Sequence, residues 1–444
     1  MNRLFSNRDL RNLIIPLLIE QILTITVGMA DTMMVSYAGE AAISGIALVD
    51  LINLLLLNVF AALATGGAVI SSQYLGKGDE EACRTSAGQL LLVTVLISIG
   101  IMILVLCFKR PFLMRLYPSV EVGVMENAVT YLRISAYSYP ALAIFHSCAA
   151  LFRTMGNSRV SMEVSLGMNL MNVIGNAVLI FGFSLGVAGA AWASTVSRVA
   201  AALVMCFLLR DRRRVIYLGR ENLRHLEPAL AGKILAIGIP GGIENGFFQL
   251  GRVLVVSIIA SFGTVQIAAN AVANNLDNLG CISGQAMNLA MVAVVGRCIG
   301  AGDYEQVQAY VKKLMKLAYV AGAVANGLVL LLLPLILRLY VLAPETETLT
   351  RILVWIHCGL GILMWPAAFT LPNALRAAGD VRSTMLISIV SMVVFRLLFS
   401  VLLGIHLGLG AIGVWLAMIL DWIFRIILFI WRYRLGKWKS IRLV

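Results

Sequence analysis

Runs of about twenty apolar residues follow one another along almost the whole chain, separated by short polar breaks. A helix needs about 20 mostly apolar residues to cross the hydrocarbon core of a bilayer. The 444 residues are 60% hydrophobic and 13% charged, with a mean hydropathy of +0.91, whereas about 25% of a soluble domain is charged. The sequence therefore predicts an all-α polytopic membrane protein. We expect about twelve spans, near residues 13–36, 48–73, 86–108, 128–152, 161–183, 187–209, 233–262, 269–296, 314–340, 350–375, 383–405 and 412–431.

Most of the 35 Lys and Arg residues lie in the two termini and in the loops after every second predicted span. Such a bias marks the cytoplasmic side of a membrane protein, so it explains the net charge of +13 without a nucleic-acid partner. We expect both termini to be cytoplasmic in a multi-pass protein of the bacterial inner (plasma) membrane. The first span has no small-residue cleavage site and is expected to be a retained helix. The linker cluster should share the cytoplasmic side: Arg210, Arg212, Arg213, Arg214, Arg220, Arg224 and Lys233.

The seven cysteines form no CxxC pair, and the four histidines are isolated in the sequence. These spacings indicate neither a disulfide framework nor a metal site, and we expect no cofactor. The chain contains no HExxH or GxSxG motif and no selectivity-filter-like segment, so an enzyme or a channel is not favoured. We expect a monomer surrounded by membrane lipid.

The segment QYLGKGDEEA at residues 73–82 has a counterpart in RCIGAGDYEQ at 297–306. The register that aligns these two turns also maps Pro16 on Pro240 and Glu20 on Glu244. Further along, FRTMGNSRVSM pairs with LRAAGDVRSTM, one position out of that register. Because six spans are an even number, the halves are predicted to be parallel repeats of six helices. We assign residues 1–210 to the first lobe, 211–232 to a basic linker and 233–444 to the second lobe.

The paired turns have a predicted structure of their own. Each contains two glycines that should end a helix, because glycine adopts backbone angles that other residues avoid. We expect Asp79 or Asp303, directly after the glycines, to cap a short cytoplasmic helix.

Polar side chains within the spans are few, and an intramembrane carboxylate is a functional hypothesis by default. Asp31 lies in the outer half of the first span, and Glu20, earlier in the same span, falls about 20° away on the same helical stripe. In the fifth span, Asn169, Asn172 and Asn176 form a polar ladder at i, i+3, i+7 spacing. The ladder could serve a site or bond neighbouring helices together.

The remaining intramembrane charges have two interpretations each. Glu20 and Glu244 are candidate cavity residues, although their matched positions also suit a shared structural role beside the prolines. Asp277 could contact substrate or be neutralised by Arg252. We predict a structural ion pair between Arg396 and Asp421, which also has Arg425 at i+4.

The sequence resembles the multidrug and toxic compound extrusion (MATE) family of cation-coupled exporters along essentially its whole length. The resemblance is carried by Pro16, Asp31 and Gly39, and by SQYLGKGD, FRTMGNSR, NLMNVIGNAVLIFG and GVAGAAWAS with their echoes in the second half. It is strongest to bacterial members whose ion site lies in the N-terminal lobe. Within this resemblance, Pro16 is a hinge of the first span and Tyr131 is near the site.

The resemblance implies that Asp31 binds the coupling ion, assisted by Asn172, Asn176 and a hydroxyl at Ser194. Asn176 departs from the family, which has an aspartate there, so Asp31 is the only acid expected in this site. Sodium binding, which depends on several negative oxygens, is therefore less favoured than proton binding. The glutamate that another branch carries in span 7 is replaced here by Phe248.

A carboxylate removed from water is disfavoured in its charged form, so Asp31 is expected to exchange a proton. The expected function is proton-coupled antiport of organic, often cationic, drugs or metabolites by alternating access between two lobes. Two alternatives remain open, namely a sodium-coupled exporter and a lipid-linked oligosaccharide flippase of the same superfamily.

Overall fold

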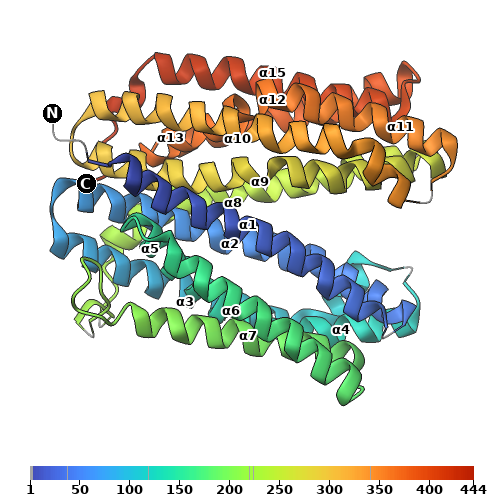
Figure 1. Ribbon diagram of the computed structural model, residues 1–444. Coiled ribbons are helices and arrows are strands. Elements are labelled where there is room, and N and C mark those ends of the chain that lie inside the picture. Colours follow the sequence, from blue (N-terminus) through green and yellow to red (C-terminus); the bar gives the residue numbers. More distant parts are fainter. Residues whose placement is uncertain (1–3, 38, 119, 220, 224, 341) are drawn as a thin grey trace. The chain divides into compact units, whose positions relative to one another are not determined.

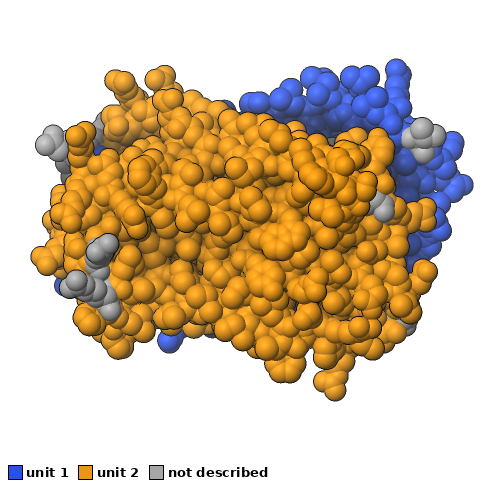
Figure 2. Space-filling view, turned by 90° about the horizontal axis from the view of Figure 1, so that it is seen from below, with its two compact units in different colours: residues 1–4, 243–444 blue, residues 5–242 orange. Residues whose placement is uncertain are grey.

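The computed structural model describes residues 4–37, 39–118, 120–219, 221–223, 225–340 and 342–444, and the side chains of residues 29–32 and 36 fall outside this description. All regular secondary structure in the described chain is helical, which confirms the predicted fold class. The chain forms two compact units, residues 5–242 and residues 243–444 with Leu4, coloured separately in Figure 2.

The N-terminal unit is built from long helices that lie side by side (Figure 1). Helix α1 packs along α6, α6 along α7, and α2 against α3, α4 and α5. The elements are α1 (Asn7–Ser36), α2 (Glu40–Lys77), α3 (Glu80–Leu116), α4 (Val122–Ala136), α5 (Tyr139–Thr154), α6 (Ser158–Asn176), the π-helical segment η1 (Ala177–Gly182), α7 (Gly186–Leu208) and the short η2 (Glu221–Leu223).

The C-terminal unit begins within α8, since the division between the units falls between residues 242 and 243. Several of its helices contain π-helical segments, which occur frequently at functional sites. The elements are α8 (Pro228–Ala260), α9 (Thr264–Gly300), α10 (Tyr304–Leu339), α11 (Pro344–Val354), η3 (Trp355–Gly359), α12 (Leu360–Trp365), η4 (Pro366–Thr370), α13 (Leu371–Ala377), α14 (Val381–Val390), η5 (Ser391–Leu398), η6 (Val401–His406), α15 (Gly410–Arg434) and η7 (Lys437–Ser440).

Eleven helices of the described chain are long and apolar enough to cross a membrane. They match eleven of the twelve predicted spans, and most extend several residues beyond the predicted ends. The remaining prediction, residues 128–152, corresponds to two shorter helices, α4 and α5. The break at Tyr137 and Ser138 precedes Pro140, which occupies the first turn of α5. Proline has no amide hydrogen to continue the hydrogen-bond ladder of the preceding helix.

Many large apolar side chains lie on the outside of the units. Leu203, Phe207 and Leu331 are 66%, 74% and 75% exposed, respectively. A soluble protein rarely exposes extensive apolar patches, whereas hydrocarbon chains of lipid solvate them. Helix α9 differs, because 67% of its most apolar window is buried. It is therefore largely an interior helix of the C-terminal unit.

The paired glycine turns have nearly the same backbone geometry in both halves. Gly78 and Gly302 have φ angles of +81° and +70°, in the left-handed region that glycine adopts without a steric cost. Asp79 accepts a hydrogen bond from the Ala82 amide at 3.0 Å, and Asp303 from the Gln306 amide at 2.9 Å. The predicted caps are confirmed, but they begin α3 and α10 of 37 and 36 residues rather than short helices. No proline interrupts the residues between each cap and the apolar span that follows, so the helix does not stop.

Candidate functional site

Hydrogen-bonded polar side chains connect α6 and α7 in the N-terminal unit. Asn172 Nδ2 donates to Ser194 Oγ at 2.9 Å, and Asn176 Nδ2 donates to Asn172 Oδ1 at 3.3 Å. Asn172 and Asn176 are buried, at 6% and 1% exposed. The structure thus brings together three of the four residues that the resemblance assigned to ion coupling. Asn176 ends α6 where η1 begins, so the ladder lies at a change of helical pitch.

The other residues predicted for this site are located on the same helices or next to them. Asp31 belongs to α1, which packs along α6, but its side chain lies outside the described residues. Pro16 lies within α1, which continues through it without a break. Asn169 is half-buried on α6, one turn before Asn172. Tyr131 is buried on α4 within the apolar core of the unit.

The N-terminal unit contains a second acid, Asp50 on α2, that the sequence interpretation did not count. Asp50 interacts with the polar side chains of Asn53 and Tyr131 and experiences the positive charge of Arg198 on α7. Tyr139 Oη also donates to Asn53 Oδ1, at 3.0 Å. Asp50 does not contact Asn172, Asn176 or Ser194 in any described interaction, so the prediction that Asp31 is the only acid of that site stays a prediction. An intramembrane arginine needs a counter-charge, and Arg198 was the sequence signal that could have pointed to Asp50.

Glu20 and Glu244, which occupy matched positions in the duplication, both face an arginine. Glu244 Oε1 lies 2.6 Å from Arg376 Nη2. Glu20 accepts a hydrogen bond from Ser161 Oγ at 3.1 Å and interacts electrostatically with Arg153. Both glutamates are 8% exposed, so each half encloses one carboxylate against a basic residue.

In the C-terminal unit, Asp421 is fully buried between two arginines. Its Oδ1 lies 2.9 Å from Arg425 Nε, and its Oδ2 lies 3.5 Å from Arg396 Nη1. Ser391 also donates to Asp421. The position that carries a glutamate in another branch of the resembled family holds Phe248, which packs edge-on against Phe369. No carboxylate occupies that position.

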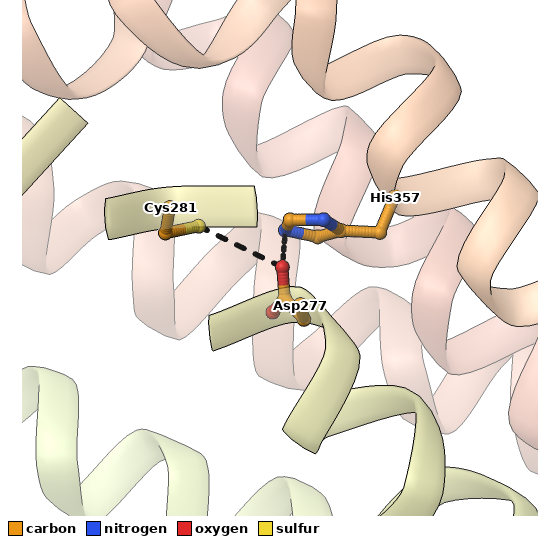
Figure 3. Close-up of side chains that lie close together, drawn as sticks. All are labelled: Asp277, Cys281 and His357. Atoms are coloured by element: carbon orange, nitrogen blue, oxygen red, sulfur yellow. Dashed lines mark hydrogen bonds and ion pairs between the residues drawn. The ribbon is translucent and has the colours of Figure 1, made fainter. Parts of the chain in front are cut away.

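Asp277 on α9 contacts His357 of η3, and the positive charge of Arg252 also acts on it. The imidazole Nε2 forms an ion-pair or hydrogen-bond contact with Asp277 Oδ1 (Figure 3). Cys281, one turn along α9, donates its thiol to the same oxygen over 3.7 Å. His357 is 3% exposed and Asp277 18%. From the sequence alone we interpreted His357 as isolated, because Asp277 lies far from it along the chain. Only the packing of the helices brings the two residues together.

Aromatic rings and positive charges surround the Asp277 cluster. The His357 ring lies edge-on to Trp415 and Trp422, with centroids 6.0 and 4.9 Å away. Arg252 and Arg396 act electrostatically on Asp277. The donor atoms of Asp277, Cys281 and His357 lie within 4.8 Å of one another, a spacing that a metal ion could bridge. The two nearby guanidinium groups oppose a bound dication.

A small cavity of about 40 Å³ lies among the same helices of the C-terminal unit. Arg252, Arg396, Asn270, Asn274 and Trp415 contribute to its walls. It has the size and the polar groups to hold water. Polar space therefore lies beside the two arginines that act on Asp277.

These features define a class of protein. Two units of long apolar helices, each with buried polar groups partway along its helices, are typical of secondary transporters. The chain is a multi-pass membrane protein of the transporter class.

Comparison with known proteins identifies the family. The MatE family model matches residues 16–178 and again residues 240–402, two matches in the same register as the paired turns. The chain belongs to the MatE family.

Relatives and solved structures agree with this assignment. The chain is 27% identical to "Uncharacterized transporter YisQ" of Bacillus subtilis, over 96% of this chain and 94% of that protein. It is 26% identical to "Probable multidrug resistance protein NorM" of Thermotoga maritima, over 98% and 93% respectively. The fold is similar to a crystal structure of MATE in the bent conformation, with a TM-score of 0.88 and 18% identity over 98% of this chain and 96% of that one.

Proposed function

We propose that this transporter is a proton-coupled antiporter that exports organic, often cationic, compounds from the cytoplasm. Membership of the MatE family supports export, and several relatives carry the name of probable multidrug resistance proteins. The distribution of basic residues supports cytoplasmic termini and a cytoplasmic linker.

The packing of α1, α6 and α7 carries the proposal. These three helices bear Asp31, the Asn172–Asn176 ladder and Ser194, and they are neighbours in the fold. The bonds from Asn176 to Asn172 and from Asn172 to Ser194 orient three uncharged polar groups. A carboxylate on the adjacent helix would be the charged member of such a group.

The chemistry of these side chains favours a proton over sodium. Asn176 supplies an amide where the family has a carboxylate, and the nearby Asp50 is offset by Arg198. A metal ion of hard character is bound best by several negatively charged oxygens, whereas a proton needs only one basic oxygen. Asp31 supplies that oxygen.

The cycle follows from the charge on Asp31. When deprotonated, Asp31 attracts an organic cation or favours the substrate-binding state. When a proton arrives from the outside, the charge is lost and the cargo is released. One proton exchanged for one monovalent cation moves no net charge, so a pH gradient drives export with about 1.4 kcal/mol, or tenfold, per pH unit.

The substrate class rests on composition and on the names of relatives. Nineteen methionines and seven tryptophans suit an adaptable apolar cavity. A flippase for lipid-linked oligosaccharides is the second candidate, favoured by the arginines of the C-terminal cavity. Efflux of a lipophilic cationic dye from energised cells separates the two, because a flippase leaves dye accumulation unchanged.

Reconstitution into liposomes tests the proposal. A pH gradient and a sodium gradient are imposed separately, with Asp31→Asn beside the wild type and a lipophilic cation as substrate. We expect the pH gradient to drive transport in the wild type and not in the variant, while the variant keeps its thermal stability in detergent. Transport driven by sodium alone would refute proton coupling, and an active variant would exclude Asp31.

A further inference from the structure

We propose that Asp277 and His357 form a second proton-binding site, in the C-terminal unit, which is loaded and emptied once per transport cycle. This inference rests on the proposed proton-coupled export and extends it from one proton to two.

The site is built by two packed elements of the C-terminal unit. Asp277 and Cys281 are one turn apart on the interior helix α9, and His357 comes from the π-helical segment η3, which packs against α9 (Figure 3). The π-helical turn shifts the side-chain register of its helix, and such turns recur at functional sites. Intramembrane pairs of aspartate and histidine are typical of proton relays in pumps and transporters.

The contact leaves room for a second proton. Asp277 Oδ1 and His357 Nε2 are in direct contact, so one proton lies between them. His357 Nδ1 is buried and has no hydrogen-bond partner among the described residues. A proton that binds there converts the pair from a net charge of −1 to a neutral imidazolium–carboxylate pair, and its release restores the negative charge. No other bond changes.

Four charged or titratable groups act directly on the pair, namely Cys281 on α9, Cys358 on η3, Arg252 on α8 and Arg396 on η5. Asp421 and Arg425 on α15 act in turn on Arg396. Asp421 is already held by Arg396 and Arg425. Arg252 and Arg396 favour the negative form of the Asp277 pair and so keep the added proton exchangeable. Both arginines line the polar cavity, and Trp415, which lines it too, touches the His357 ring.

The duplication argues against a purely structural role. In the register of the paired turns, Asp277 corresponds to Asn53, whose Oδ1 accepts the Tyr139 hydroxyl at 3.0 Å. The first copy thus carries an uncharged amide at this position. The acid and its histidine partner belong to the second copy alone. Asp277→Asn is consequently a conservative test, since the same repeat already accommodates asparagine there.

The number of protons can be read from the electrical character of transport. Two protons exchanged for one tetraphenylphosphonium ion move one net charge, whereas one proton moves none. A potential of 100 mV then changes the limiting concentration ratio about 50-fold. In liposomes at equal pH on both sides, we expect this potential to drive tetraphenylphosphonium transport by the wild type beyond the passive uptake of protein-free liposomes.

Asp277→Asn and His357→Gln should both lose transport driven by the potential while they retain transport driven by a pH gradient. His406→Gln, which alters an exposed histidine of the same unit, is the matched control and should behave as the wild type. If the variants keep the response to potential, or if the wild type responds only to pH, the second site is refuted. A wild type that does not respond to a pH gradient refutes the proposed function instead.

A measurement on the wild type covers the case in which a variant does not fold. Tetraphenylphosphonium is added to the detergent-solubilised protein in weak buffer, and a pH-indicator dye counts the protons released. We expect two per bound cation, and one in Asp31→Asn if that variant still binds. Release of a single proton by the wild type would overturn the inference. A zinc-dependent change in that count would do so too, because it would make the cluster a metal site.

Discussion

Glu244 on α8 and Arg376 on α13 form an ion pair in which Oε1 lies 2.6 Å from Nη2. Arg376 also donates to Asn373 Oδ1 at 2.9 Å. In the first copy of the repeat, Glu20 is opposed by Arg153 and receives a hydrogen bond from Ser161. Both copies of the repeat therefore pair a glutamate with an arginine. The polar side chain that supports the pair differs between the two copies.

Glu244→Gln should destabilise the protein strongly. Removal of one partner leaves the other charge in a mostly buried place, at a cost of about 3 kcal/mol. Thermal unfolding in mild detergent measures the effect. Glu163→Gln is the control, because the Arg159–Glu163 pair is exposed and should contribute less than about 0.5 kcal/mol. Equal shifts in the two variants would contradict a buried role for Glu244.

Asn176→Asp should introduce sodium dependence. The variant supplies a second carboxylate to the polar ladder, and a site with more negative oxygens binds a hard cation better. Asn176→Ala removes the amide without adding charge and should show no sodium drive. Transport by liposomes under a sodium gradient at equal pH checks both variants. A sodium response of the alanine variant would mean that Asn176 does not select the ion.

Asp50→Asn should lower stability more than it lowers proton coupling. The substitution removes the negative charge that acts on Arg198, at a cost of about 1 kcal/mol, because Asp50 is exposed and Arg198 is only half-buried. The double variant Asp50→Asn with Arg198→Met should recover much of the lost melting temperature. If Asp50→Asn instead abolishes transport driven by pH while the melting temperature stays unchanged, Asp50 is a coupling acid.

Gly78→Ala and Gly302→Ala should each destabilise the protein by about 1–2 kcal/mol, because alanine is strained in the left-handed region. No atom lies within 4 Å of the added Cβ at either site, so the effect is one of backbone conformation. Gly232→Ala, within α8 and equally open, should stabilise the protein by about 0.4–1 kcal/mol. Melting temperatures compare the three. Destabilisation by Gly232→Ala would indicate that steric space, and not the backbone angle, determines the effect of these substitutions on stability.

The membrane spans and the duplication were accessible from the sequence. A helix must contain a minimum number of apolar residues to cross the bilayer. This requirement applies to each segment separately, so eleven spans could be located before the tertiary structure was known. The sequence predicted one span at 128–152, where the structure has the two helices α4 and α5. The break at residues 137 and 138 was missed because the apolar pattern continues through it, although Pro140 follows directly.

The sequence by itself determined which residues cross the membrane and which turns repeat, because those properties depend on neighbours along the chain. Only the tertiary structure decided that His357 meets Asp277 and that Asp50 meets Tyr131. Each pair joins residues from helices that are distant in the sequence, and their contact depends on which faces of packed helices meet. Hydropathy does not predict which faces meet, since one polar residue hardly changes the mean hydropathy of its helix.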